Sequence, residues 1–518
     1  MATCLALASI VSAAGAATNN TPGQAEEQAA HVLNRIAFGA RPGDIERVAK
    51  MGVNRYIDEQ LYPERIALPK PLSARLAELP VLRMSQGALV ARFRDIQRQV
   101  KDDKEQGKDA RRDLVRELSE QAGEARLISA IDSPRQLEEV MVDFWYNHFN
   151  VFAGKGLDRS LVANYEQEAI RPYALGKFRD LLAATAHHPA MLFYLDNWLS
   201  SAPGYQAPNG GAQKLAGLNE NYARELMELH TLGVDGGYSQ KDVTELARIL
   251  TGWTFDPREK GEGSTFRFDA RRHDWGTKQW LNRTVAPRGQ AEGEWALNIL
   301  AQSPATAHHI SYELAQYFVN DTPPKALVER MTQRYLATDG DIRAVLATLL
   351  HSPEFLDPAT EGAKFKTPYQ YVVSAVRASG IEVYNVRPLL GTLTQLGMPL
   401  YGCQTPDGYK NTEDAWLNSD AMTRRINFAT ALASGRLPLE RRIDEASLSG
   451  RPADRTLQNP ATASAGDDRL PPPEPLDADR LLDTLGESIS GKTLTALANT
   501  EPQLRAALVL GSPDFMRR

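Results

Sequence analysis

Residues 219–234 read Asn-Glu-Asn-Tyr-Ala-Arg-Glu-Leu-Met-Glu-Leu-His-Thr-Leu-Gly-Val, and this stretch decides the fold class. Each residue of an α-helix advances by about 100°, so Ala223 and Leu226 share one face with other apolar side chains. Gly236-Gly237 supply a left-handed turn after this helix, and Ser239 caps a second one. The same spacing of apolar residues recurs along nearly the whole chain, which predicts a mainly α-helical protein.

The flanking segments extend this pattern. Ser133-Pro134-Arg135-Gln136 is typical of a helix start, and an apolar stripe follows it. Residues 90–127 alternate acidic and basic side chains around a thin apolar stripe, which predicts an exposed helical arm interrupted near Gly107. Only residues 256–290 are strand-like. We therefore expect an all-α fold, a large multi-helix domain with long loops and at most a small β-hairpin insertion.

The chain divides into four parts by composition. Residues 1–17 are an apolar run followed by small residues, which is typical of a secretory signal peptide. Residues 24–435 form the helical domain, 436–475 are a proline-rich linker or loop, and 476–518 return to a helical pattern that we expect to pack on the main domain.

Composition excludes several classes of protein. Charged residues make up 24% of the 518 residues and the net charge is -6, so no basic surface for nucleic acid is indicated. No run approaches the roughly 20 apolar residues that span a bilayer. Cleavage of the signal removes Cys4 and leaves Cys403 as the single thiol, which excludes an internal disulfide in the mature chain. We expect a periplasmic or secreted protein.

Several motifs together resemble the bacterial family catalogued as domain of unknown function 1800 (DUF1800). The resemblance covers about residues 27–436 and the C-terminal Ser-Pro-Asp-Phe, and it implies an exported, largely helical protein with an envelope or secreted role. The motifs that carry it are Phe144-Trp145-Tyr146-Asn147-His148-Phe149, Tyr194-Leu195-Asp196-Asn197, Asn219 to Val234, Asp242-Val243, Thr251-Gly252-Trp253, His273-Asp274, Trp416-Leu417-Asn418, Arg424-Arg425 and Ser512-Pro513-Asp514-Phe515.

Two carboxylates of the 219–232 helix are the first candidate catalytic groups. Glu225 and Glu228 lie on one stripe with Asn221, and a half-apolar stripe is a costly place for two carboxylates unless they are paired or used. One hypothesis is an acid–base pair in a cleft, in which Asn221 and Arg224 contact the substrate. The alternative is a buried ion-pair network in which Arg224 joins Glu220 to Glu228.

A histidine at the end of an apolar stripe is the second candidate. His148 continues the stripe that starts at Leu137, so it is either a satisfied core histidine or a catalytic group on a cleft wall. Asn147 and Tyr146 beside it resemble the residue types of helical polysaccharide lyases, so we treat both as candidate substrate-binding residues. The remaining helical histidines are predicted to be structural, among them His187, His308, His309 and His351.

The irregular segment after residue 256 supplies the third set. His273 and Asp274 are candidates because loop residues often carry function, with Asp274 catalytic and His273 and Lys278 binding substrate. Trp253 is a candidate for stacking on a sugar ring. The competing interpretation is a turn with a surface histidine and a core tryptophan.

Three functions remain open at this point. The first is an exported polysaccharide-degrading enzyme. As a hydrolase it would use Glu225 with Glu228, or one of them with Asp274, and as a lyase it would use Asn147, His148 and either Tyr146 or Tyr222. The second is a non-catalytic envelope scaffold that binds a protein partner through residues 90–127. The third is a metal-dependent enzyme, because Glu225 and Glu228 have the spacing of helical carboxylate ligands. We expect a carbohydrate polymer as partner and no cofactor.

Overall fold

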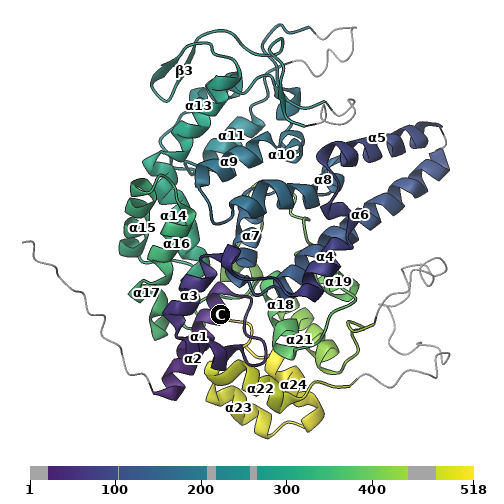
Figure 1. Cartoon of the computed structure of the whole chain (residues 1–518), viewed down its shortest axis with the longest axis vertical. Helices are drawn as coiled ribbons and strands as arrows, with labels where there is room; N and C mark the ends of the chain where they lie inside the picture. The colour runs from purple at the N-terminus through teal and green to yellow at the C-terminus, as the bar shows by residue number, and fades with distance from the viewer. Residues whose placement is uncertain (1–20, 103, 207–216, 257–264, 442–473) are drawn as a thin grey trace, which may run out of the picture.

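The computed structural model describes residues 21–102, 104–206, 217–256, 265–441 and 474–518, and in these ranges it is mainly helical (Figure 1). This confirms the all-α prediction. The expected signal peptide 1–17 and most of the expected linker 436–475 lie outside the described residues. Two small antiparallel strand pairs fall in the region where one hairpin was expected: β1 (Trp253–Thr254) with β2 (Arg267–Phe268), and β3 (Lys278–Trp280) with β4 (Arg283–Val285).

Most helices follow one another through short connections, whereas long segments separate α10 from α11, α12 from α13 and α21 from α22. The first eight are α1 (Pro22–Ile36), α2 (Asp44–Met51), α3 (Val53–Gln60), α4 (Lys70–Ala77), α5 (Gln86–Asp102), α6 (Lys104–Asp132), α7 (Gln136–His148) and α8 (Asp158–Tyr165). The next eight are α9 (Phe178–His187), α10 (Pro189–Tyr194), α11 (Asn221–Glu228), α12 (Gln240–Ile249), α13 (Gln290–Ala301), α14 (Pro304–Phe318), α15 (Lys325–Ala337) and α16 (Ile342–Leu350). The last are α17 (Pro353–Leu356), α18 (Pro368–Ser379), α19 (Arg387–Gln395), α20 (Glu413–Trp416), α21 (Ser419–Ala433), α22 (Ala478–Leu485), α23 (Gly491–Ala498) and α24 (Pro502–Leu510).

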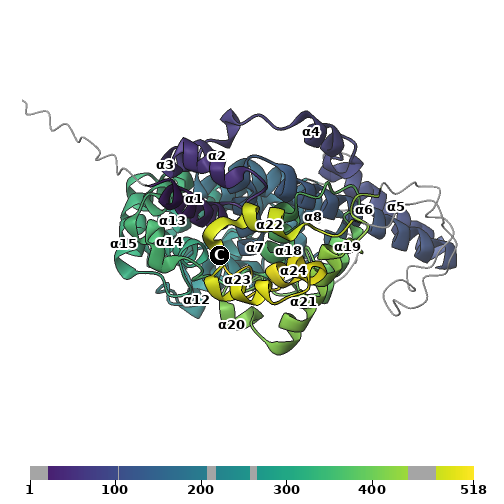
Figure 2. The same cartoon turned by 90° about the horizontal axis from the view of Figure 1, so that it is seen from below.

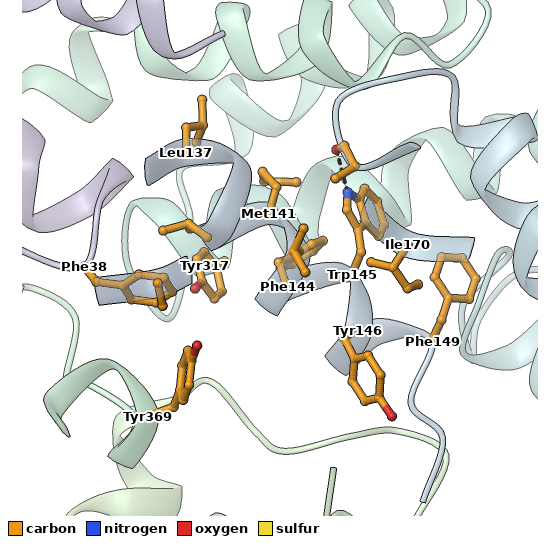
Figure 3. Close-up of a cluster of buried hydrophobic side chains, with 14 of the residues drawn as sticks. Phe38, Leu137, Met141, Phe144, Trp145, Tyr146, Phe149, Ile170, Tyr317 and Tyr369 are labelled. Atoms are coloured by element: carbon orange, nitrogen blue, oxygen red, sulfur yellow. Dashed lines mark hydrogen bonds between the residues drawn. The ribbon is translucent and has the colours of Figure 1, made fainter. Parts of the chain in front are cut away.

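Helix α7 lies at the centre of the molecule and is buried on nearly every side. Figure 3 shows Met141, Phe144 and Trp145 of this helix among aromatic side chains from other segments. The indole nitrogen of Trp145 donates to the carbonyl of Ala174 at 3.0 Å, so the large ring is buried without an unsatisfied donor. The carboxylate of Asp143, also buried, pairs with Arg126 at 2.5 Å. Because α7 is packed on nearly every side, its position is fixed along its whole length, including the end that carries His148.

Helices α5 and α6 form the predicted arm, a two-helix hairpin that extends beyond the body of the molecule (Figures 1 and 2). Gly107, where an interruption was expected, lies within the printed bounds of α6. An ion pair between Arg92 and Glu117, 2.8 Å long, joins the two helices across the hairpin. At its base, Leu118 and other apolar side chains of α6 enter the core.

The C-terminal helices α22, α23 and α24 pack beside the N-terminal helices and against α21 (Figure 2). The hydroxyl of Tyr371 in α18 donates to the carbonyl of Leu510 at 2.9 Å. The last residues run antiparallel to a segment before α18, where the amide of Lys366 donates to the carbonyl of Met516 at 2.9 Å. Segments from both ends of the chain therefore close one continuous core.

Candidate active site

A cleft of about 330 Å³ opens where α7, the end of α11, α14 and the loop before α20 meet. Three of the predicted site residues line this cleft: Asn147, His148 and Glu228. The described lining residues are Asp143, Phe144, Asn147, His148, Glu228, Leu229, Val234, His309, Glu313, Gln316, Tyr317, Thr367, Met398, Asp407, Tyr409, Lys410, Asn411 and Thr412.

The carboxylate of Glu313 lies between two imidazole rings in this cleft. One carboxylate oxygen is 2.8 Å from Nδ1 of His148, and the other is 3.6 Å from Nε2 of His309. Burial alone raises the pKa of the Glu313 carboxyl, but the positive charges of His148, His309 and Lys410 outweigh it and lower that pKa. Glu313 is therefore a carboxylate at neutral pH.

The other contact of each ring is a backbone carbonyl at the end of α11. His148 Nε2 lies 3.2 Å from the carbonyl oxygen of His230, and His309 Nε2 lies 3.2 Å from that of Leu229. Carbonyls at a helix C-terminus lack partners within the helix and carry partial negative charge, so they accept imidazole N–H groups well. The end of α11 thus fixes the orientation of both rings.

A third imidazole packs behind these two. His230 is 1% exposed, its ring centroid is 6.0 Å from that of His148, and its Nε2 has no hydrogen-bond partner in the described part of the chain. Burial and the charges of His148 and His309 lower the pKa of His230 well below its ordinary value. His230 is therefore a neutral ring that supports the site from the core.

Carboxylates gather near the end of α11. Glu228 lines the cleft, and Glu225 lies one turn before it, outside the described lining residues. Burial, the charge of Glu228 and that of Asp407 raise the pKa of Glu225. Glu225, which lies close to other carboxylates, therefore keeps its proton to a higher pH, whereas Glu313 stays ionised.

The loop 398–412 forms one wall of the cleft and is held by Asn147. The side-chain amide of Asn147 donates to the carbonyl of Tyr409 at 2.8 Å, and its oxygen accepts the amide of Tyr409 at 2.7 Å. Gly408 has φ +66°, and a Cβ atom there would lie 2.3 Å from the carbonyl oxygen of Asn147. The amide predicted to bind substrate is therefore engaged in holding the wall.

Replacement of Gly408 by alanine should lower the free energy of unfolding by at least about 2 kcal/mol. The left-handed backbone costs a side chain about 1–2 kcal/mol, and the collision with Asn147 adds to it. Gly397 is a matched control in the same loop, because it has φ +82° but open space where its Cβ atom would lie. Urea denaturation of both alanine variants checks this, and equal losses would contradict the role of close approach.

The other predicted residues of the α7 and α11 helices have structural contacts. The hydroxyl of Tyr146, a buried residue, donates to the carbonyl of Val151 at 2.9 Å. Arg224 pairs with Glu220 at 3.4 Å and with Gln240 at 2.9 Å, as one half of the predicted network. Both charged side chains are more than 30% exposed, so this network lies at the surface instead of in the core. Asn221 is exposed at the start of α11.

The His273 region forms a separate network away from the cleft. His273 and Lys278 both bind the carboxylate of Glu292, at 2.9 Å and 2.6 Å, and all three side chains are fully buried. Asp274 pairs with Arg248 at 2.7 Å, and Arg248 also holds Glu245. These contacts tie α12 and α13 to the strands. They give His273, Lys278 and Asp274 structural partners outside the cleft, which favours the structural interpretation over the catalytic role predicted for Asp274 and the substrate-binding roles predicted for His273 and Lys278.

Trp253 is likewise buried, at 0% exposure, with its ring 4.9 Å from that of His187. Its neighbours leave no face open for a sugar. The tryptophan fills the space beside Gly293 of α13, where a Cβ atom would lie 2.1 Å from the indole ring. This is the core interpretation that the sequence left open.

Sequence reasoning missed four residues of the cleft. Glu313 was not considered, and His309 was assigned to a helix end although it lies inside α14. Their spacing, His309 followed by Glu313 four residues later, places them on one helix face and is a signal that a search for paired histidine and carboxylate would have found. Asp407 and Lys410, which pair at 2.7 Å, reach the cleft from a loop without a recognisable motif.

The described residues also bear on two broader expectations. In the described ranges, no helix has both the length and the apolar character needed to cross a membrane. The same ranges contain no group of three or more His, Cys, Asp or Glu side chains placed to hold a metal ion.

The fold and cleft belong to a helical protein with a polar, ionisable site. The chain belongs to the family described as protein of unknown function (DUF1800), whose model matches residues 31–517. This confirms the resemblance over nearly the whole chain. Searches of curated proteins and of solved structures each found no match.

Proposed function

We propose that this protein is an exported enzyme that cleaves a polysaccharide by acid–base hydrolysis in the cleft between α7, α11 and α14. The observation that carries the proposal is the contrast between two carboxylate environments. Glu313 has a lowered pKa beside two imidazoles, whereas the pKa of Glu225 is raised by burial, Glu228 and Asp407. Glycoside hydrolysis needs one ionised and one protonated carboxyl group, and unequal surroundings produce that pair.

In this assignment Glu313 is the base and Glu228 is the acid that faces the cleft. Glu313 accepts a proton from the attacking water, whose oxygen bonds to the anomeric carbon. The glycosidic C–O bond breaks, and the leaving oxygen takes the proton of Glu228. Glu228 is assigned as the acid because it faces the cleft, whereas Glu225, whose pKa is raised, lies one turn before it outside the described lining residues.

Hydrolysis has more support than elimination. A lyase would use the Asn147 amide and the Tyr146 hydroxyl, but both make hydrogen bonds to backbone groups of the protein. The lining of the cleft also supports a carbohydrate. It combines carboxylates, amides and hydroxyls with the aromatic rings of Tyr317, Tyr409 and Phe144, a mixture suited to a ligand rich in hydroxyl groups.

The test is depolymerisation of a panel of soluble polysaccharides, followed through newly formed reducing ends. At least one substrate should be cleaved, and Glu228→Gln should reduce the rate about a hundredfold, the usual scale for loss of an acid–base group. Glu329→Gln, at an exposed position of α15, is the control and should keep full activity. Products with a new C=C bond would show that the reaction is an elimination. If no polysaccharide of the panel is cleaved, the proposal of a polysaccharide-degrading enzyme is rejected.

Export is part of the proposal and rests on the small-residue run through Ala17. N-terminal sequencing of the protein from a periplasmic fraction should give a start between residues 15 and 20. Periplasmic protein that retains Met1 would reject signal cleavage.

A second candidate function is partner binding through the α5–α6 arm. The arm extends beyond the body and carries exposed ion pairs such as Arg112 with Asp109 and Arg116 with Asp113. A protein partner with mixed charge would fit this surface. Reversing the charges of Arg112 and Arg116 should then abolish co-purification of that partner without changing cleavage of polysaccharide.

A further inference from the structure

The three side chains of the Glu313 group differ in how far they reach the solvent. The side chain of His148 is 4% exposed, whereas those of Glu313 and His309 are 30% and 24% exposed. His148 lines the cleft but is nearly covered, so a polymer there would meet mainly Glu313 and His309. This favours a positioning role for His148 over the catalytic role that the sequence suggested.

The contacts of His148 determine which of its nitrogens carry protons. Nε2 faces the carbonyl oxygen of His230, which can only accept a hydrogen bond, so Nε2 carries a proton. Nδ1 faces the carboxylate of Glu313 at 2.8 Å. An ionised carboxylate is also only an acceptor, so a second proton, on Nδ1, would make the ring the charged partner of Glu313.

His309 flanks Glu313 from α14, but it presents a single nitrogen both to a carbonyl and to the carboxylate. Its Nε2 faces the carbonyl of Leu229 and lies 3.6 Å from the other oxygen of Glu313. Close packing fixes the ring, because a Cβ atom at Gly233, which has φ +83°, would lie 3.2 Å from His309 Nδ1. Two consecutive carbonyls just after α11 thus hold two imidazole rings beside one carboxylate.

We propose that His148 and His309 form an imidazole clamp, held by the α11 carbonyls of His230 and Leu229, that positions Glu313 and keeps it ionised as the base of the cleft. The inference rests on the proposed function for the catalytic role of Glu313. His148 is a positioning residue, whereas His309 also contacts the substrate. The other titratable groups at the clamp are Lys410 from the loop, Glu228 from α11 and the neutral His230.

The clamp predicts the direction of a change in the pH profile. Removal of either imidazole raises the pKa of Glu313, because an attracting positive charge is lost. Activity requires ionised Glu313, so the acid limb of the rate profile should move to higher pH in His148→Gln and in His309→Gln. A residue that acts only on folding would lower the rate at every pH without moving the limb.

The experiment has one arm with substrate and one without. In the first, pH–rate profiles compare His148→Gln and His309→Gln with His308→Gln, a control at an exposed position of the same helix. The acid limb should move in the first two variants and stay in place in the third. An unchanged acid limb of the pH–rate profile in well-folded His148→Gln protein would overturn the proposal.

The second arm uses the full-length protein labelled with ¹⁵N-histidine and no ligand. The His148 ring should show two protonated nitrogens at neutral pH, and Glu313→Gln should convert it to a ring with one. A singly protonated ring in the unaltered protein would overturn the clamp. This measurement gives a result even if no polysaccharide is cleaved, so failure of the clamp can be told apart from failure of the proposed function. It also does not require that a His148 variant folds.

Discussion

Replacement of Glu313 by glutamine will reduce the rate of polysaccharide cleavage by at least about a hundredfold and up to about ten-thousandfold. Glutamine keeps the shape of the side chain and one hydrogen-bond acceptor, but it cannot take a proton from water. Steady-state rates on the best substrate of the panel provide the measurement.

The melting temperature of the same variant separates catalysis from folding. The side chain of Glu313 is 30% exposed and glutamine keeps its shape, so the change should cost much less stability than loss of a fully buried carboxylate. Glu329→Gln again controls for the loss of one surface charge. A Glu313→Gln protein that melts far below the unaltered chain but keeps its specific activity would contradict the catalytic assignment.

Replacement of Glu292 by glutamine should be the most destabilising of these changes, at about 3–5 kcal/mol. The carboxylate of Glu292 is fully buried and accepts from Lys278 and His273, so its loss leaves two buried groups without their anion. Glu294→Gln on the same helix is the control. Its side chain is 33% exposed beside Arg179, and such pairs contribute under about 1 kcal/mol. Chemical denaturation at neutral pH gives both values.

The pH dependence of stability follows from the same carboxylate. Burial raises the pKa of Glu292, but hydrogen bonds from His273 and Lys278 outweigh it, and the folded pKa is lowered. A carboxyl whose folded pKa is lowered stabilises the protein above its unfolded pKa, about 4.3, and loses this contribution as the pH falls through the folded value. Acid unfolding should therefore be less steep in Glu292→Gln. The same loss of unfolding free energy at acid pH in Glu292→Gln and in the unaltered protein would contradict this prediction.

Local signals predicted much of the fold because they act within one helix. Ser239 and Asp242 form the expected capping box at the start of α12. The Ser133-Pro134 start was placed slightly early, since α7 begins at Gln136 and Ser133 accepts the amide of Arg135 instead. Such caps depend on residues three or four apart, which the sequence displays directly.

The candidate site was predicted only in part because it depends on contacts between distant helices. His148 and Glu228 were recognised from their stripes, but the partner of His148 is a carboxylate 165 residues later, Glu313. Nothing in either helix alone indicates that pairing. Conversely, His273 and Asp274 are adjacent in the chain, yet one enters a buried network and the other pairs with Arg248. Their adjacency in the sequence suggested a functional site, whereas their contacts in the folded protein are structural.

The wall of the cleft has a consequence for when the site can exist during synthesis. Its loop is held from α7 by Asn147, but it is also held by Lys364 at the carbonyl of Asn411 and by Arg517 at the carboxylate of Glu413. Arg517 follows α14 by about 200 residues, so the ribosome adds it well after the helices of the cleft. An emerging chain therefore carries α7, α11 and α14 long before it can complete the cleft, and the site is finished only after the segment around Arg517 has docked.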